Sequence, residues 1–134
     1  SWIQAETQYV LPTGKLTLLP AKEEKSNNEN SMGVLFESEE CVILITGDRN
    51  RAGEKELIRD YALPDVDVLI AGHHGSKKAT SQELLQAVRP EIVIISVGAN
   101  NSYGHPAAEV LERLSEFGCT VYRTDKRGSV LLRR

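Results

Sequence analysis

Residues 66–76 read VDVLIAGHHGS, an apolar run that ends in a pair of histidines between two glycines. The run is short and β-branched, and its almost continuous apolar character is typical of a strand covered on both faces. Comparable runs lie at Val42–Ile45, Ile92–Ile95 and Thr120–Tyr122. We expect these four segments to be strands of one sheet.

Helical patterns alternate with these runs, at Glu54–Ala62, Ser81–Val88 and Pro106–Phe117. Strands separated by helices need crossover connections, which are right-handed and give parallel pairing. The sequence therefore predicts an α/β fold with a mostly parallel sheet and alternating helices. After the last helix, Gly128 predicts a tight turn into a final strand, Ser129–Leu132.

Three signals mark the ends of the predicted helices. Thr80 and Glu83 have the spacing of a capping box. Pro106 suits a first helical position, and Gly118 suits a helix C-terminus. These signals set the boundaries of the second and third helices.

The composition is that of one globular domain. The chain has 134 residues, of which 40% are hydrophobic and 26% charged, and this excludes the disordered, fibrous and membrane classes. No apolar run approaches the roughly 20 residues that cross a bilayer. The first residues have neither the basic start nor the apolar core of a signal peptide. The chain itself is therefore expected to be soluble.

The net charge of −3 excludes a protein that binds nucleic acid through a broadly basic surface, so any contact with DNA must be local. The polar segment Lys22–Asn30 has nothing to bury and predicts a loop. Cys41 and Cys119 lie in apolar, strand-like segments. We expect them to be buried thiols rather than a disulfide or metal ligands.

Three loops follow the first three predicted strands, at residues 46–48, 72–76 and 98–106. The loops beyond the carboxyl ends of parallel strands meet at one edge of an open α/β sheet, and ligands bind there. Together these loops carry all three histidines of the chain and one aspartate. This concentration of imidazole and carboxylate side chains predicts a functional site at that edge.

Asp48, His73 and His105 are the predicted metal ligands. Each of them alone would more simply be a turn residue or a helix cap. Their delivery to one edge changes that interpretation, because carboxylate and imidazole groups from separate loops are the usual ligands of zinc, manganese and iron.

Two roles stay open for His74. Adjacent residues of an extended loop point apart, so His73 and His74 are not expected to bind one ion in the same way. One of the two is expected to bind metal or orient a ligand, and the other to contact substrate or act as a general acid. The alternative for His74 is that it merely packs or caps.

A phosphate site is predicted next to the histidines. Gly75 and Ser76 precede a helix and offer backbone N–H groups and a hydroxyl, which suit an anion. Lys77 and Lys78 would strengthen this site if they face it, and a solvated turn is the alternative.

The loop before His105 contains Asn100, Asn101 and Tyr103. Asparagine tolerates left-handed turn conformations, so these residues are expected to fix the loop that presents His105. Contact with substrate is the alternative role.

The motifs, taken in order, resemble those of the metallo-β-lactamase-like domains of the ComEC family, the DNA-uptake channel proteins of competent bacteria. The resemblance runs through nearly the whole chain, and a series in this order is far more specific than a single HHGS. The motifs are Asn30-Ser31, Thr46-Gly47-Asp48, the run 67–76, and residues 95–98 and 101–106.

The resemblance implies the C-terminal half of an αββα sandwich with a binuclear metal site. By this similarity Asp48 bridges two zinc or manganese ions, His105 is the last ligand, and His73 is a further ligand. His74 and Ser76 are implied as catalytic residues on the phosphate side. The phosphate-binding set would be Gly75, Ser76, Lys77 and Asn101.

The chain departs from the family pattern in one respect. The leading metal motif of the family, of the type His-x-Asp-x-Asp-His, has no counterpart here. We therefore expect residues 1–134 to form a single, partial domain that lacks its N-terminal half. Alone, it is expected to bind metal weakly and to be inactive.

The resemblance implies a metal-dependent nuclease that processes DNA, as a single strand, during transformation. The full-length protein would lie in the cell membrane with this domain at the extracellular face, and the rest of the channel would be its partner. Two alternatives come from other classes of protein. One is a module that guides DNA without cutting it, and the other is a stand-alone hydrolase of small phosphoesters or lactones.

Overall fold

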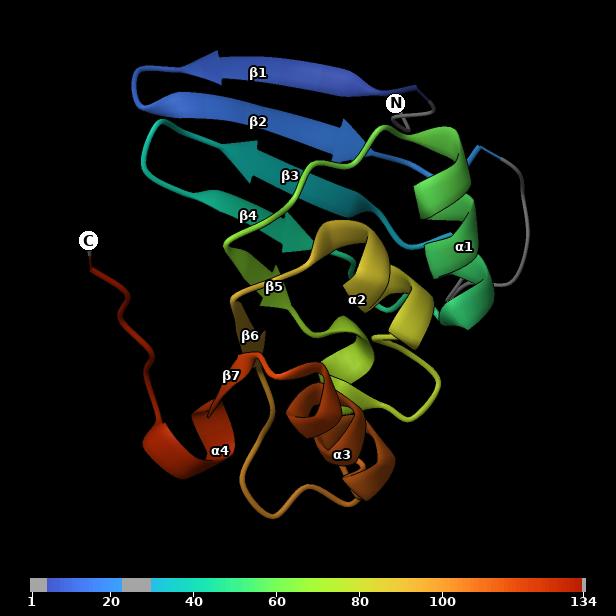
Figure 1. Ribbon diagram of the computed structural model, residues 1–134, viewed down its shortest axis with the longest axis vertical. Coiled ribbons are helices and arrows are strands. Elements are labelled where there is room, and N and C mark those ends of the chain that lie inside the picture. Colours follow the sequence, from blue (N-terminus) through green and yellow to red (C-terminus); the bar gives the residue numbers. More distant parts are fainter. Residues whose placement is uncertain (1–4, 23–29, 134) are drawn as a thin grey trace.

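The computed structural model describes residues 5–22 and 30–133. A single seven-stranded sheet runs through it, with helices between the later strands (Figure 1). The strands are β1 (Thr7–Leu11), β2 (Gly14–Leu19), β3 (Gly33–Glu37), β4 (Val42–Ile45), β5 (Val68–Ile70), β6 (Ile92–Ile95) and β7 (Thr120–Arg123). The helices are α1 (Arg51–Asp60), the short 3₁₀ helix η1 (Gly72–Gly75), α2 (Gln82–Val88), α3 (Ala108–Phe117) and α4 (Thr124–Arg127).

The α/β fold is confirmed, but the sheet is evenly mixed. The strands β1 to β4 pair antiparallel, and β4 to β7 pair parallel. Two of the three antiparallel pairs, β1–β2 and β3–β4, are joined by short turns. Between β3 and β4, for example, the amide of Ser38 donates to the carbonyl of Cys41 at 3.0 Å, and such a tight turn cannot make a crossover.

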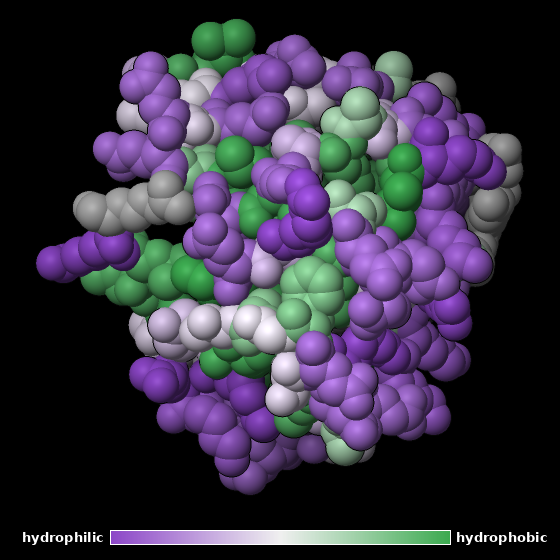
Figure 2. Space-filling view, in the orientation of Figure 1, coloured by the Kyte–Doolittle hydropathy of each residue, from purple (hydrophilic) through white to green (hydrophobic). Residues whose placement is uncertain are grey.

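One face of the sheet carries the hydrophobic core. Leu44, Leu69 and Val93 lie side by side in the strand register and are fully buried. Helices α1, α2 and α3 all pack on this face, because the same core cluster contains Leu57, Leu84, Leu85, Val88, Val110 and Leu114. On their outer side the surface is mainly hydrophilic, with small apolar areas (Figure 2).

The opposite face of the sheet is also apolar, and we call it the open face. Register and alternation place two rows of side chains there. None of them belongs to the core cluster under the helices, and Ile45 is 39% exposed. The two rows are Leu16, Phe36, Ile43, Val68 and Ile92, and then Leu18, Val34, Ile45, Ile70, Ile94 and Tyr122.

The predicted capping box is wrong by one residue. Ser81, not Thr80, caps α2, since its hydroxyl accepts a hydrogen bond from the amide of Leu84 at 3.2 Å. The Thr80 hydroxyl is used elsewhere, by the amide of Gly72 at 3.0 Å. The Glu83 side chain pairs with Arg51 instead of turning back to the cap.

The limits of α3 were predicted at one end only. Gly118 ends the helix in the left-handed conformation, with φ of 90°, as predicted. The helix begins at Ala108 rather than at Pro106, and Ala107 is its N-cap. Pro106 instead packs against Gly75, where a Cβ would lie 2.7 Å from the Cβ of Pro106.

The predicted final strand, Ser129–Leu132, is wrong. After β7 the chain turns into α4, and residues 129–133 have no regular structure. The Thr124 hydroxyl accepts from the amide of Val97 and donates to its carbonyl, which ties the start of α4 to the end of β6. Leu131 is 73% exposed, so the apolar alternation of this segment is not used for pairing.

Cys41 and Cys119 are free thiols and half-buried, and burial raises the pKa of the Cys119 thiol. The predicted loop Lys22–Asn30 falls mostly outside the described residues. Within residues 5–22 and 30–133, no helix has both the length and the apolar character to span a bilayer.

Candidate functional site

The three loops predicted to meet do so at the carboxyl edge of the parallel strands. The amide of His73 donates to the carbonyl of Gly47 at 3.0 Å, which joins the loop after β4 to the loop after β5. The amide of Ala107 donates to the carbonyl of Gly75 at 2.9 Å, which joins the loop after β6 to the same turn. All three histidines are thereby gathered at one edge of the sheet.

The histidine turn has an unusual backbone. His73 and His74 have φ of 47° and 55°, and Gly75 follows with φ of 82°. Left-handed conformations are uncommon for residues other than glycine, and they persist where the surrounding structure fixes them. Here the fixing group is Thr80, whose hydroxyl accepts from the amide of Gly72 at the start of the turn.

Thr80 is itself held by a buried carboxylate. Glu54, in α1, is fully buried and accepts hydrogen bonds from the amides of Thr80 at 2.6 Å and Ser81 at 2.9 Å. Thr80 has φ of 52°, which is strained for a β-branched residue. A chain of hydrogen bonds therefore runs from α1 through Thr80 to the histidine turn.

His73 and His105 form a close pair, with ring centroids 5.9 Å apart. The Nδ1 atom of each ring is enclosed and has no hydrogen-bond partner among the residues that the structure describes. Enclosed polar atoms are almost always paired, and an exception calls for an explanation such as an ion. A neutral imidazole offers one lone pair, so the two enclosed nitrogens suit a metal of the zinc or manganese kind.

The pair falls short of a complete metal site. Among the residues that the structure describes, no three or more His, Cys, Asp or Glu side chains are grouped closely enough to hold a metal ion. Asp48 is exposed at the end of the neighbouring loop. The metal-ligand roles predicted for Asp48, His73 and His105 therefore stay predictions.

His74 is oriented differently from the pair. Its Nδ1 lies 2.9 Å from the carbonyl oxygen of Ser96. A carbonyl can only accept, so Nδ1 carries the proton and donates it. The predicted acid–base role would use Nε2, the other nitrogen of this exposed ring.

Gly75 and Ser76 have structural contacts of their own. The amide of Ser76 donates to the carbonyl of His73 at 3.0 Å, so it is not available to an anion. The Ser76 hydroxyl accepts from the amide of Lys78 at 3.3 Å and keeps its own proton for a ligand. Gly75 lets Pro106 approach closely, as described above.

Asn101 shapes the loop that presents His105. Its side-chain amide donates to the carbonyls of Gly98 at 3.0 Å and His105 at 2.7 Å. Its oxygen accepts from the amides of Tyr103 and His105, both at 3.1 Å. The predicted loop-fixing role is thus seen directly, and the donors of Asn101 are already engaged.

Tyr103, for which substrate contact was the alternative to a role in fixing the loop, presents an exposed ring. Its ring is stacked on His105, with centroids 6.0 Å apart and planes inclined by 23°. The side chain is 80% exposed. An exposed aromatic face beside a histidine pair is suited to stacking on a planar ligand.

Similar proteins were found by sequence, although no protein-family model matches the chain. ComE operon protein 3 of Bacillus subtilis is 37% identical over 113 residues, or 84% of this chain. Recombination protein 2 of Haemophilus influenzae is 38% identical over 79% of it, and competence protein ComA of Neisseria gonorrhoeae is 37% identical over 67% of it. The chain belongs to the ComEC family of competence proteins. It spans 13% to 15% of the length of these relatives.

A solved structure identifies the fold. The CmlA β-hydroxylase E377D mutant, which has a metallo-β-lactamase fold, superposes with a TM-score of 0.55 and 11% identity. The match covers 87% of this chain and 31% of that one. The predicted family and fold class are therefore both confirmed.

Two groups in this ComEC homologue could not be predicted from its sequence. Glu54 binds backbone amides 26 and 27 residues away, and such contacts leave no local pattern. Arg51 and Arg113 come from different helices and meet Lys77 and Lys78 around one recess. The two lysines were the only sequence signal for that recess.

Proposed function

We propose that this chain is the C-terminal half of a metal-dependent phosphodiesterase domain that acts on DNA during uptake. The observation that carries the proposal is the His73–His105 pair, with two enclosed ring nitrogens that lack partners at the carboxyl edge of a metallo-β-lactamase fold. The relatives named as competence and recombination proteins support DNA as the substrate.

In this proposal His73, His105 and Asp48 would hold divalent metal. Zinc or manganese bound there would supply hydroxide at neutral pH and would neutralise charge on the scissile phosphodiester. His74, held through Nδ1 by Ser96, gives a proton from Nε2 to the leaving oxygen. The Ser76 hydroxyl donates to a phosphate oxygen next to Gly75. Asn101 acts only through the loop that presents His105, because its amide donors are engaged there.

The remaining metal ligands belong, in this proposal, to an N-terminal half of the same domain. Two features support this. The described residues hold no group of three ligands, and the open face carries two rows of apolar side chains, most of them only partly buried. A second sheet packed on it would bury that surface and complete a sandwich.

We assign a single DNA strand as substrate because Tyr103 is exposed and already stacked on His105. Bases of a single strand stack on such rings without regard to sequence. The full-length protein would lie in the cell membrane, with this domain at the extracellular face and the rest of the channel as its partner.

The test uses the complete domain, with metal analysis beside cleavage of a single-stranded oligonucleotide. Asp48→Asn should lose both metal and activity, because the charge that holds two ions together is gone. His74→Ala should keep its metal and lose activity by about 10²-fold or more. Asp65→Asn, at an exposed residue paired with Arg89, is the control and should change neither. An Asp48→Asn domain that carries two metals and cuts normally would refute the proposal.

A second function is favoured by one observation, the lack of a three-ligand group among the described residues. In this alternative the domain guides DNA and does not cut it. The complete domain would then bind the oligonucleotide without any metal-dependent cleavage.

A further inference from the structure

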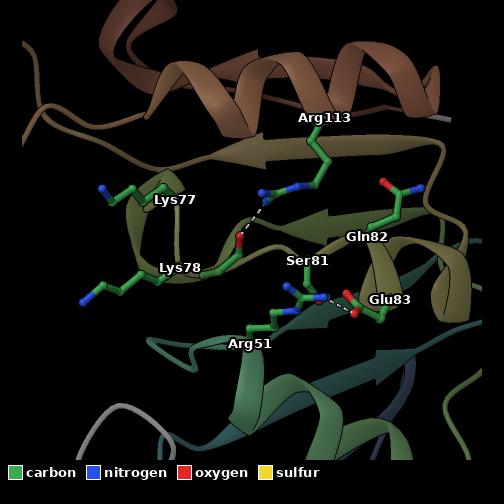
Figure 3. Close-up of a pocket in the computed structure, with 8 residues that line it drawn as sticks. Arg51, Lys77, Lys78, Ser81, Gln82, Glu83 and Arg113 are labelled. Atoms are coloured by element: carbon green, nitrogen blue, oxygen red, sulfur yellow. Dashed lines mark hydrogen bonds and ion pairs between the residues drawn. The ribbon is translucent and has the colours of Figure 1, made fainter.

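A recess lies beside the histidine turn, between α1, α2 and α3 (Figure 3). Its volume is about 140 Å³, which corresponds to roughly four or five water molecules. Four cationic side chains and one carboxylate line it, together with small and amide residues: Arg51, Lys77, Lys78, Ala79, Ser81, Gln82, Glu83 and Arg113. A chain of net charge −3 thus concentrates positive charge at one place.

The cations of the recess are largely unpaired. The Lys77 and Lys78 side chains have no partner among the described residues, and both are exposed at one side of the recess (Figure 3). Arg113 donates through one nitrogen to the carbonyls of Ala79 at 3.2 Å and Thr80 at 2.9 Å. Its other donors have no partner among residues 5–22 and 30–133.

Two of the cations have an acidic neighbour among the described residues. Arg113 lies close enough to the buried Glu54 to oppose the rise in the pKa of that carboxyl. Arg51 forms an ion pair with Glu83, whose second carboxylate oxygen has no hydrogen-bond partner in the described part of the chain. Glu83 is the carboxylate that lines the recess, and its removal would release Arg51.

The loop that carries the lysines is rigidly positioned. Glu54 holds its far end through Thr80 and Ser81, and the amide of Arg51 donates to the carbonyl of Lys78 at 2.8 Å. These bonds fix the backbone from which the Lys77 and Lys78 side chains extend, so less backbone entropy is lost on binding.

The recess lies close to the histidines. Lys77 follows His74 by three residues, and three residues span at most about 11 Å. A nucleic-acid strand in B-form advances 3.4 Å per nucleotide. The edge of the recess is therefore within about three nucleotides of the histidine turn.

We propose that this recess binds the phosphodiester backbone of the nucleic-acid strand that occupies the histidine site. This inference rests on the proposed function for the position of the strand. Arginine and lysine suit phosphate because the guanidinium offers paired donors and the ammonium offers a point charge. The recess would hold the strand a few nucleotides from the scissile bond and fix its direction.

The test measures binding of a fluorescently labelled oligothymidylate to this chain by anisotropy, in EDTA, over a series of salt concentrations. Lys77→Gln/Lys78→Gln should weaken binding by about fivefold at low salt, and the slope of log K against log salt should become shallower by about 1.4. Lys126→Gln/Arg133→Gln removes the same charge from exposed residues outside the recess and is the matched control. It should have much less effect.

A variant that is expected to tighten binding complements this test. Glu83→Gln should tighten binding about twofold to threefold, because Arg51 is freed and a repulsive charge is lost. Glu112→Gln, on the exposed side of α3, should leave binding unchanged. Lys77→Arg/Lys78→Arg should restore the affinity, which excludes a fold defect as the cause of the loss.

Competition identifies the ligand chemistry. Inorganic pyrophosphate should displace the oligonucleotide, and polyglutamate of equal charge should do so far less. Equal losses in the two double variants, or equal competition by polyglutamate, would overturn the proposal. Because no metal or cleavage is involved, failure here is distinct from failure of the nuclease proposal.

Discussion

The carboxylate of Glu54 accepts a hydrogen bond from the amide of Thr80 at 2.6 Å, across 26 residues of chain. Thr80 in turn holds Gly72, the residue before the two histidines. A buried acid in α1 thus fixes the geometry of a turn to which it contributes no ligand.

The Glu54 carboxylate should make stability depend on pH in a defined direction. Burial raises its pKa above the ordinary value of 4.5, and the amides of Ser81 and Thr80 oppose this shift. The folded state therefore binds the proton more tightly than the unfolded state. The stability that Glu54 contributes is full below pH 4.5 and is lost as pH rises through the raised pKa.

Glu54→Gln cannot titrate and tests this dependence. The difference in free energy of unfolding between wild type and Glu54→Gln should be largest at low pH and should shrink as pH rises, by at most about 1.4 kcal/mol per pH unit. Urea unfolding from pH 4 to pH 8 measures it, with Glu112→Gln as control. A difference that grows with pH would contradict the assignment.

Gly75→Ala should destabilise the chain through a direct overlap. A Cβ there would lie 2.7 Å from the Cβ of Pro106, and φ is 82°. Gly118→Ala has a comparable φ of 90° and nothing within 4 Å of the new Cβ. Both variants should lose about 1–2 kcal/mol in free energy of unfolding, because alanine is strained in the left-handed conformation. Gly75→Ala should lose about 1–3 kcal/mol more from overpacking. Thermal unfolding of the two variants compares them, and equal losses would show that the turn can give way.

This chain should bind zinc weakly and through two histidines. Their enclosed Nδ1 atoms are the fitting ligands, and two ligands are fewer than a stable zinc site uses. Calorimetric titration should lose its signal in His73→Ala or His105→Ala and keep it in His74→Ala, whose Nδ1 is bonded to Ser96. Tight binding of two ions per chain would mean that the described residues suffice.

The open face should bind an apolar dye in the folded state. ANS fluorescence with wild type should exceed that with Ile45→Thr/Ile70→Thr, which removes two adjacent apolar groups of one row and keeps the β-branched shape. Val10→Thr, at a residue 88% exposed on β1, is the control for an isolated apolar side chain. No enhancement with the wild-type chain would mean that the face is covered in solution.

Local pattern was enough to predict the alternation of strands and helices and the meeting of the three loops. Those features depend on side-chain periodicity and on turn residues such as Gly118, which act within a few positions. The prediction of a strand at Ser129–Leu132 was wrong because an alternating apolar pattern shows that a segment could pair, and not that a neighbouring strand is available. Thr124, at the start of α4, instead accepts a hydrogen bond from the amide of Val97, just after β6.

The site was predicted less completely than the fold. His73, His74 and His105 could be placed at one edge because they follow strands. The role of Asn101 in its loop was also visible, since asparagine favours such turns. Glu54, Arg51 and Arg113 could not be found, because their contacts join segments that no short-range rule connects. For Tyr103 the sequence favoured a role in the turn and left substrate contact as the alternative, because exposure and stacking appear only in three dimensions.

The strands of the sheet lie in the same order as they occur in the chain. Each new strand therefore meets an edge that its predecessor has already formed, and none must be inserted between two others. During synthesis, at about 5–20 residues per second, the antiparallel hairpins would emerge first and could close in microseconds. As they leave the ribosome, the later parallel strands would then pair one at a time with the last strand already in the sheet.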